Sequence, residues 1–92
     1  TLIRAFDRSR QALSDIRESI LRAQRFVAGF DVAAFEADDR TNHAVIRCLE
    51  IISEASRHVS AEVKERHNHL PWKQIADAGN VYRHVYGAVR LE

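Results

Sequence analysis

The sequence predicts an all-α fold, a small antiparallel bundle of four to five helices. The chain of 92 residues contains only three glycines and one proline, so few positions favour turns. Apolar residues recur at steps of three and four, which is the spacing of an amphipathic helix, and no apolar–polar alternation reaches strand length. A chain this short forms one domain, expected over residues 1–92, and its abrupt end is compatible with a missing C-terminal helix.

The first helix is predicted from Ser9 to Ala28, and Gly29 is suited to end it because glycine readily adopts a left-handed backbone. On its exposed face, Glu18 and Arg22 stand four residues apart in the order that favours an ion pair. The buried face is predicted to be an apolar stripe of Leu13, Ile16, Ile20, Ala23 and Val27. A brief helical turn and linker is expected over residues 31–39.

A second long helix is predicted after an N-cap at Asp39 or Thr41, and we expect it to be the central helix. Cys48 is the only cysteine, and within this apolar segment it is interpreted as a small buried hydrophobic residue, not a nucleophile. Ile46 and Ile51 widen the apolar face. The stripe itself comprises Val45, Cys48, Leu49, Ile52, Ala55 and Val59.

Ser60 is predicted to cap a short third helix. The polar residues 67–69 (HNH) are expected to separate this helix from the next. Pro71 suits the first turn of a last helix, over about 72–86, because its missing N–H is not needed there. Gly79 lies inside this helix, where glycine is unfavourable. We therefore expect another backbone to approach closely at Gly79, with the partner subunit of a dimer as one candidate.

Charge and hydropathy exclude several classes of protein. With a formal net charge of +1, the chain has no global field that attracts nucleic acid, although a local basic site is compatible with it. No stretch reaches the ~18 consecutive apolar residues of a membrane span, and no signal peptide is recognisable. A lone cysteine fits a reducing compartment, so we expect a cytoplasmic protein that does not bind membranes. Because so small a domain buries little surface, we also expect a homodimer.

Four polar side chains gather near the end of the last predicted helix: Asn80, Arg83, His84 and Tyr86. Asn80 precedes Arg83 by three residues and His84 by four, so these three share one helix face, and Tyr86 follows Arg83 by three. Arginine can neutralise charge on a phosphodiester, histidine can move a proton near neutral pH, and asparagine can orient either group. This set is the candidate catalytic site, although a solvated polar helix face has the same spacing.

The other histidines do not predict a metal site. His67 and His69 form an H-x-H pair, but no further histidine or cysteine lies at helical spacing to complete a tetrahedral set. His43 and His58 lie near the two ends of the second helix, where surface or capping roles are expected. We predict neither a metal nor any other cofactor.

Three ordered blocks stand out in the second half of the chain: residues 47–55 (RCLEIISEA), 71–76 (PWKQIA) and the ending of 80–86 (NVYRHVY). Together they resemble the HepT-like branch of the HEPN superfamily, and the resemblance extends from about Asp15 to Val89. It implies a helical-bundle homodimer in which the two H-x-Y helices meet near the two-fold axis. It also implies a metal-independent endoribonuclease that cleaves RNA and acts as the toxin of a toxin–antitoxin pair.

The same resemblance implies a protein partner. Family toxins are paired with a small nucleotidyltransferase antitoxin encoded alongside them. In some pairs the antitoxin transfers AMP to the tyrosine of H-x-Y, which in this chain is Tyr86. Such a modification would fill the expected RNA-binding cleft beside Tyr86 and neutralise the positive charge there.

The chain departs from the family motif at one position. The motif places four to six residues between an arginine and the histidine, as Arg-x(4–6)-His-x-Tyr, and the corresponding residues here are Asp77, Ala78 and Gly79. Either Arg83 takes over the binding of phosphate, or the ribonuclease site is weakened. Moving four residues along a helix rotates a side chain by only ~40°, so the substitution by Arg83 is geometrically reasonable.

A second polar group lies on the central helix, where Arg47, Glu50 and Glu54 follow one another at steps of three and four. Charges on an apolar helix are paired when they are buried, so a salt-bridge network that positions helices is one interpretation. The other is that these residues orient the face that carries Arg83 and His84.

Three functional hypotheses follow from the sequence. The first is a dimeric endoribonuclease toxin. The second is a catalytically weak binding module that engages the nucleotidyltransferase and is modified on Tyr86. The third is a helical dimerisation domain that does not interact with nucleic acid, which the near-zero net charge favours.

Overall fold

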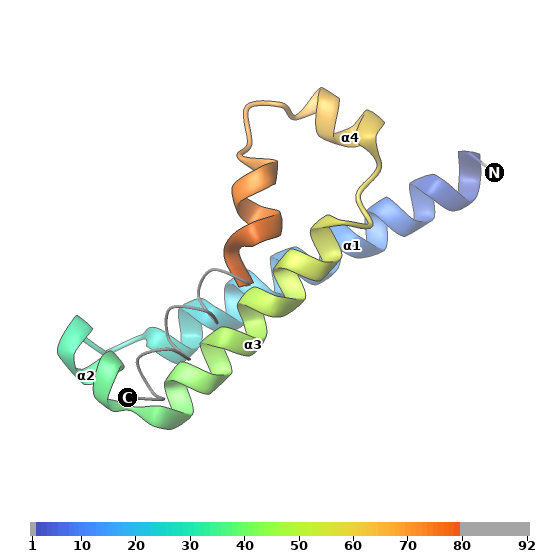
Figure 1. The fold of residues 1–92 in the computed structure, drawn as a ribbon. Helices are drawn as coiled ribbons and strands as arrows, with labels where there is room; N and C mark the ends of the chain where they lie inside the picture. The colour runs from blue at the N-terminus through green and yellow to red at the C-terminus, as the bar shows by residue number, and fades with distance from the viewer. Residues whose placement is uncertain (1, 80–92) are drawn as a thin grey trace.

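A computed structural model describes residues 2–79, and within that range the chain forms helices and loops but no strand (Figure 1). Two long helices, α1 (Leu2–Val27) and α3 (Asp39–Ser56), lie antiparallel and side by side. The short α2 (Val32–Ala37) joins them at one end, and α4 (Ala61–Arg66) leads to a helix over residues 72–79 that returns to α3. The predicted all-α bundle is therefore confirmed.

Helix α1 begins at Leu2, well before the predicted start at Ser9. The predicted start was wrong because Ser9 lies inside the helix, where its hydroxyl serves a contact with another segment. It is buried, at 2% exposure, and accepts a hydrogen bond of 2.9 Å from the main-chain N–H of Ser60. The other end agrees with the prediction, since α1 stops at Val27 and Gly29 has a φ of 83°, in the left-handed region.

The fully buried residues of α1 are small, although the half-buried Ile16 also packs against the core. Ser9, Ala12 and Ser19 are buried, and small side chains allow two helices to pack closely. The predicted stripe was wrong for three of its members, because Leu13, Ile20 and Val27 are 39%, 43% and 37% exposed. These three lie on a flank of the helix, beside the buried face.

The predicted stripe of the second long helix is buried except at Leu49, which is only half-buried. Its last member, Val59, is buried but lies in the turn after α3, because the helix ends at Ser56. Cys48 is 3% exposed, and burial raises the pKa of its thiol, although Arg22 and Arg25 nearby act in the opposite direction. A thiol held in its neutral form is a poor nucleophile, which fits the interpretation of Cys48 as a core residue. The ion pair predicted between Glu18 and Arg22 is present at 2.8 Å.

The connection between the long helices is fixed by two aspartate caps. Asp31 caps α2 by accepting a hydrogen bond of 2.7 Å from the N–H of Ala34. Asp38 caps α3, where its carboxylate accepts a hydrogen bond of 2.9 Å from the N–H of Thr41. The prediction of Asp39 or Thr41 as the cap was therefore wrong: Asp38 has the extended backbone of an N-cap, and Asp39 already lies in the first helical turn.

Asn42→Ala is expected to destabilise this connection. Asn42 is fully buried, and its amide donates hydrogen bonds to the carbonyls of Phe35 (2.9 Å), Glu36 (3.3 Å) and Asp38 (2.8 Å). Removing the donor leaves these acceptors without it, at a cost of about 1–3 kcal/mol in the free energy of unfolding. Urea denaturation measures this loss, and Asn68→Ala at an exposed loop position should change little. Equal midpoints for the two variants would contradict the expectation.

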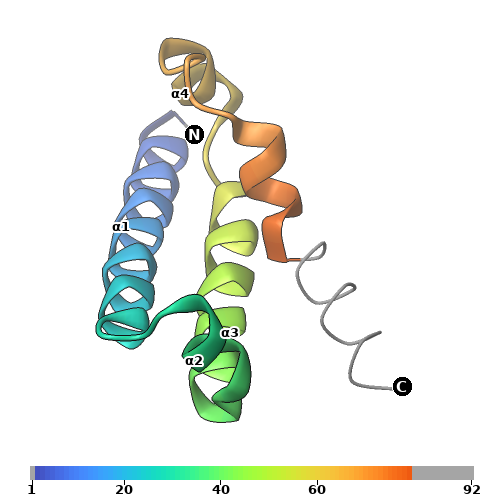
Figure 2. The same ribbon diagram turned by 90° about the vertical axis from the view of Figure 1, so that its left-hand side faces the viewer.

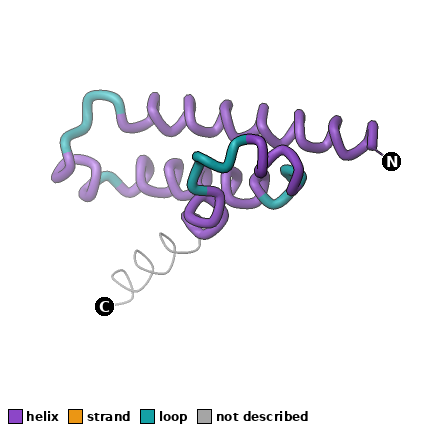
Figure 3. The backbone as a smooth tube through the Cα atoms, turned by 90° about the horizontal axis from the view of Figure 1, so that it is seen from above, coloured by secondary structure: helices purple, strands orange, loops and turns teal. Residues whose placement is uncertain are grey.

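Beyond α3 the chain makes an arch that brings it back to the same helix (Figure 3). Ser60 caps α4 as predicted, accepting a hydrogen bond of 3.2 Å from the N–H of Val63. The polar segment 67–69 forms turns, and the indole of Trp72 donates a hydrogen bond of 3.0 Å to the carbonyl of His67. Within residues 2–79, no helix is long and apolar enough to cross a membrane.

Candidate functional site

The four candidate catalytic residues, Asn80, Arg83, His84 and Tyr86, lie outside the described residues. The structure does describe residues 72–79, the helix that leads directly into them in the sequence. This helix packs on a different side of α3 from α1 (Figure 2). The geometry that bears on the site is therefore the contact between α3 and residues 72–79.

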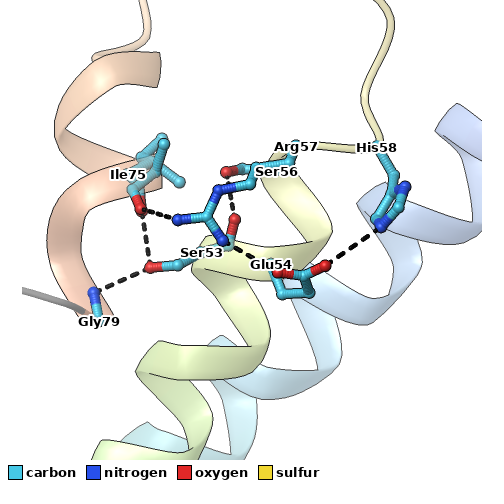
Figure 4. Close-up of polar contacts among 8 residues, drawn as sticks. Ser53, Glu54, Ser56, Arg57, His58, Ile75 and Gly79 are labelled. Atoms are coloured by element: carbon cyan, nitrogen blue, oxygen red, sulfur yellow. Dashed lines mark hydrogen bonds and ion pairs between the residues drawn. The ribbon is translucent and has the colours of Figure 1, made fainter.

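A single buried hydroxyl joins the two helices. The Ser53 hydroxyl accepts a hydrogen bond of 2.8 Å from the N–H of Gly79 and donates one of 3.1 Å to the carbonyl of Ile75 (Figure 4). Ser53 is 3% exposed, so water does not compete strongly for either bond. Both hydrogen-bonding capacities of the hydroxyl are thus used to hold one turn of the helix against α3.

Gly79 itself packs against the main chain of α3. A Cβ built at this position would lie 3.0 Å from Ser53 Oγ, 3.2 Å from Glu50 Cα and 3.2 Å from the carbonyl oxygen of Leu49. The predicted close approach of another backbone at Gly79 is therefore confirmed. The approaching backbone belongs to α3 of the same chain, not to a partner subunit.

This packing bears on the motif arginine that the sequence lacks. Position 79 is one of the three at which the family motif places it, and here a side chain would crowd α3, with contacts of 3.0–3.2 Å from its Cβ. Asp77, at another of the three positions, is exposed, and Ala78 is half-buried. An arginine at position 79 would therefore require α3 or this helix to shift, whereas one at position 77 would not.

A chain of polar contacts extends from this junction along the surface of α3. Arg57 donates hydrogen bonds to the carbonyl of Ala76 (3.3 Å) and to the carboxylate of Glu54 (2.9 Å). The second oxygen of Glu54 lies 3.4 Å from Nε2 of His58 (Figure 4). The side chains of Arg57, Glu54 and His58 are 47%, 66% and 50% exposed, so these ion pairs contribute little to stability.

The predicted polar group Arg47, Glu50 and Glu54 lines a cleft of about 190 Å³ on α3. Arg47 and Glu54 are exposed and Glu50 is half-buried. A larger cleft of about 480 Å³ between α1 and α3 shares Asp15, Ala55 and His58 with it. Carboxylates outnumber guanidinium groups in both linings, with Asp15, Glu50 and Glu54 against Arg47 in the smaller cleft and Asp7 and Asp15 against Arg8 in the larger. Neither cleft therefore favours an anionic ligand such as a phosphodiester.

The histidines of the loop after α4 lie near each other, with the rings of His67 and His69 edge to face at 6.0 Å between centroids. Within residues 2–79, no group of three or more histidine, cysteine, aspartate or glutamate residues is placed to hold a metal ion.

Two residues at the junction carry roles that the sequence reasoning did not assign. Ser53 and Arg57 were not among the predicted site residues, yet both bond to residues 72–79. The available signal was a small polar residue on an otherwise apolar helix, paired with a glycine where glycine is unfavourable. Only the fold brings Ser53 and Gly79 together across 26 positions of sequence.

Comparison with known proteins identifies the family. Residues 16–92 match the family described as "Ribonuclease HepT-like". The chain is 36% identical over 77 residues to "Probable ribonuclease HepT" of Thermococcus cleftensis, covering 84% of this chain and 70% of that protein.

Further relatives have similar names. A protein of Methanocaldococcus jannaschii named as a "Putative RNase" is 36% identical over 74 residues, covering 80% of this chain and 68% of that protein. A "Putative RNase" of Caldanaerobacter subterraneus is 36% identical over 63 residues, covering 68% and 56%. No solved structure shows a significant match. The chain therefore belongs to the HepT-like ribonuclease family, as its resemblance to this branch of the HEPN superfamily predicted.

Proposed function

We propose that the protein is a metal-independent endoribonuclease and the toxin of a toxin–antitoxin pair. The observation that carries this proposal is the family match, because residues 16–92 include the whole candidate catalytic set, Asn80, Arg83, His84 and Tyr86. The similar proteins are themselves named as ribonucleases. The tight attachment of residues 72–79 to α3 supports it, since a catalytic segment needs a rigid base.

The proposed reaction uses the 2′-hydroxyl of the RNA as the nucleophile. Its oxygen attacks the adjacent phosphorus, forming a 2′,3′-cyclic phosphate as the bond to the 5′-oxygen of the next nucleotide breaks. His84 takes the proton from the hydroxyl or gives one to the leaving oxygen. Arg83 stabilises the negative charge that develops on the phosphorus oxygens, Asn80 orients these groups, and Tyr86 binds the phosphate.

We further propose that the site forms at the interface of a homodimer, where each chain supplies one His84 and the two histidines divide the roles of acid and base. An apolar stripe on α1 supports the dimer. Phe6, Leu13, Ile20 and Val27 follow one another at steps of seven, which places successive residues within about 20° on the helix. All four are between 37% and 48% exposed, and exposed apolar stripes mark contact surfaces.

The proposed partner is a nucleotidyltransferase antitoxin, with the hydroxyl of Tyr86 as the acceptor of AMP: its oxygen attacks the α-phosphorus of ATP, and pyrophosphate leaves as the α–β phosphoanhydride bond breaks. The added phosphate introduces negative charge and bulk where the RNA phosphate binds, which would block the reaction. The buried free thiol of Cys48 suits a reducing compartment, so we propose that both proteins act in the cytoplasm.

Cleavage of labelled single-stranded RNA and transfer RNA in EDTA tests the proposed activity. We expect cleavage that co-elutes with the folded protein in gel filtration and continues at an unchanged rate after chelation, because no step requires a metal. The elution volume also reports whether the protein is a dimer. Folded protein that leaves both RNAs intact would refute the ribonuclease proposal.

One observation favours a second candidate function. Position 79 lacks the motif arginine, and a side chain there would crowd α3, so the chain could serve as a weakly active binding module that the nucleotidyltransferase modifies. Mass spectrometry after co-expression distinguishes the two. Modified Tyr86 in a protein that does not cleave RNA supports the binding module, whereas RNA cleavage by the unmodified protein supports the ribonuclease.

A further inference from the structure

We propose that Ser53 is a positioning residue for the proposed ribonuclease site, whose hydroxyl sets the orientation of the helix that leads to His84. This inference rests on the proposed function. Ser53 is distant in sequence from the candidate catalytic residues and belongs to α3, but it bonds to Gly79, which immediately precedes Asn80.

The two partners of the Ser53 hydroxyl are a main-chain donor and acceptor four residues apart in one helix. In an α-helix the N–H of each residue pairs with the carbonyl four residues earlier, so Gly79 and Ile75 are the donor and acceptor of one such pair. The hydroxyl accepts from the first at 2.8 Å and donates to the second at 3.1 Å. A side chain that bonds to both ends of one helical pair fixes that turn in rotation and in height along α3.

Close packing accompanies the hydrogen bonds. The backbone of Gly79 lies so close to α3 that even a methyl group would meet Glu50 Cα and the Leu49 carbonyl oxygen at 3.2 Å. The missing Cβ therefore allows the close approach at which the Ser53 hydroxyl reaches the N–H of Gly79. Without the hydroxyl, only the exposed bond from Arg57 to the carbonyl of Ala76, at 3.3 Å, is left among the described hydrogen bonds between these helices.

Small changes in orientation at this turn are amplified downstream. The sequence predicts that the helix continues to Tyr86, which places His84 about 7.5 Å along the axis from Gly79. A roll of about 20° moves an atom about 6 Å from the axis by roughly 2 Å. Misplacement of a catalytic group by ~1 Å can cost about 10²-fold in rate.

Ser56 provides a matched control. It lies on α3 one turn beyond Ser53 and is equally buried, at 0% exposure against 3%. Its hydroxyl donates a hydrogen bond of 2.7 Å to the main-chain carbonyl of Ser53, which is a contact within α3. Ser56→Ala therefore removes one buried hydroxyl and one hydrogen bond within α3, and it leaves the hydrogen bonds of Ser53 to residues 72–79 in place.

The experiment compares Ser53→Ala and Ser56→Ala in the full chain by three measurements: amide hydrogen exchange of Gly79, the pH titration of the His84 imidazole by NMR, and steady-state RNA cleavage. For Ser53→Ala we expect loss of protection at Gly79, an altered His84 titration, and a fall in kcat of about 10–100-fold with little change in KM. Ser56→Ala should match the wild type in all three, within about threefold in kcat, although both variants lose stability.

The outcomes separate the two proposals. Indistinguishable results for Ser53→Ala and Ser56→Ala would overturn the positioning role. Exchange and titration do not require activity, so they still decide the role of Ser53 if the wild type fails to cleave RNA and the proposed function falls. A fall in kcat that follows the loss of stability equally in both variants would also overturn it.

Discussion

Replacing His84 with alanine is expected to lower the rate of RNA cleavage by about 10²–10⁴-fold while leaving the fold intact. The imidazole is the only group in the candidate set that changes charge near neutral pH, and positioned general acid–base catalysis contributes a factor of this size. In the proposed dimer, His84→Ala removes the histidine of both chains. Neither the proton transfer from the 2′-hydroxyl nor the one to the leaving oxygen is then assisted. Cleavage of a labelled RNA in EDTA by wild type and variant measures the loss.

A histidine outside the site controls for indirect effects. His58 lies in the turn just after α3, 50% exposed and 3.4 Å from Glu54, and has no proposed part in the reaction. His58→Ala should therefore retain activity within about twofold, because an exposed pair contributes little. If both variants lose activity, or if His84→Ala melts far below the wild type, His84 is a structural residue and the proposed mechanism fails.

The fold could be predicted from the sequence because its elements have strong local signals. The steps of three and four define α1 and α3, Ser60 caps α4, and Gly29 ends α1 in the left-handed conformation that glycine favours. Boundaries were less predictable where several residues offer the same chemistry. Asp38, Asp39 and Thr41 can all cap a helix, and the backbone selects Asp38.

The buried face of α1 was not predictable from hydrophobicity alone. Leu13 and Ile20 are larger and more apolar than Ala12 and Ser19, yet the smaller pair faces α3. Packing between helices depends on how closely they fit, and a serine can enter the interface when its hydroxyl finds a partner, as Ser9 does with Ser60. The large apolar side chains of Leu13 and Ile20, on the flank of α1, can contact a surface other than α3.

The candidate site also contains residues that could be predicted from the sequence and one that could not. The catalytic residues were proposed from local spacing and family resemblance, and the close approach at Gly79 from the cost of glycine inside a helix. Ser53 could not be found by either route, because its partners Ile75 and Gly79 lie more than 20 positions away in sequence. Its role follows only from the return of the chain to α3.

Gly79→Arg restores the arginine of the family motif and is expected to destabilise the protein without improving cleavage. Any side chain at position 79 meets Ser53 Oγ at 3.0 Å and the main chain of α3 at 3.2 Å. Overpacking of this kind costs about 1–3 kcal/mol, and the displaced helix also loses a hydrogen bond to Ser53 worth about 1 kcal/mol. The gain in helix propensity over glycine, about 0.8 kcal/mol, does not offset this.

The expected net loss is about 2 kcal/mol, which corresponds to a fall in Tm of roughly 8–16 °C for a domain of this size. Asp77→Arg is the matched control, since it places an arginine at an exposed position that also satisfies the motif spacing. It should leave Tm nearly unchanged because surface substitutions are usually within about 0.5 kcal/mol. Thermal unfolding and RNA cleavage of both variants, each also combined with Arg83→Ala, complete the test.

The combined variants decide which arginine binds the phosphate. If Arg83 has taken over this role, Arg83→Ala lowers cleavage by about 10²–10³-fold, the size of effect seen when one stabilising donor is removed. Gly79→Arg then cannot rescue it, because the helix must move away from α3 to admit the new side chain. A stable Gly79→Arg protein that cleaves RNA faster than the wild type would show that α3 and residues 72–79 separate readily. The contact through Ser53 would then not hold the catalytic segment in place.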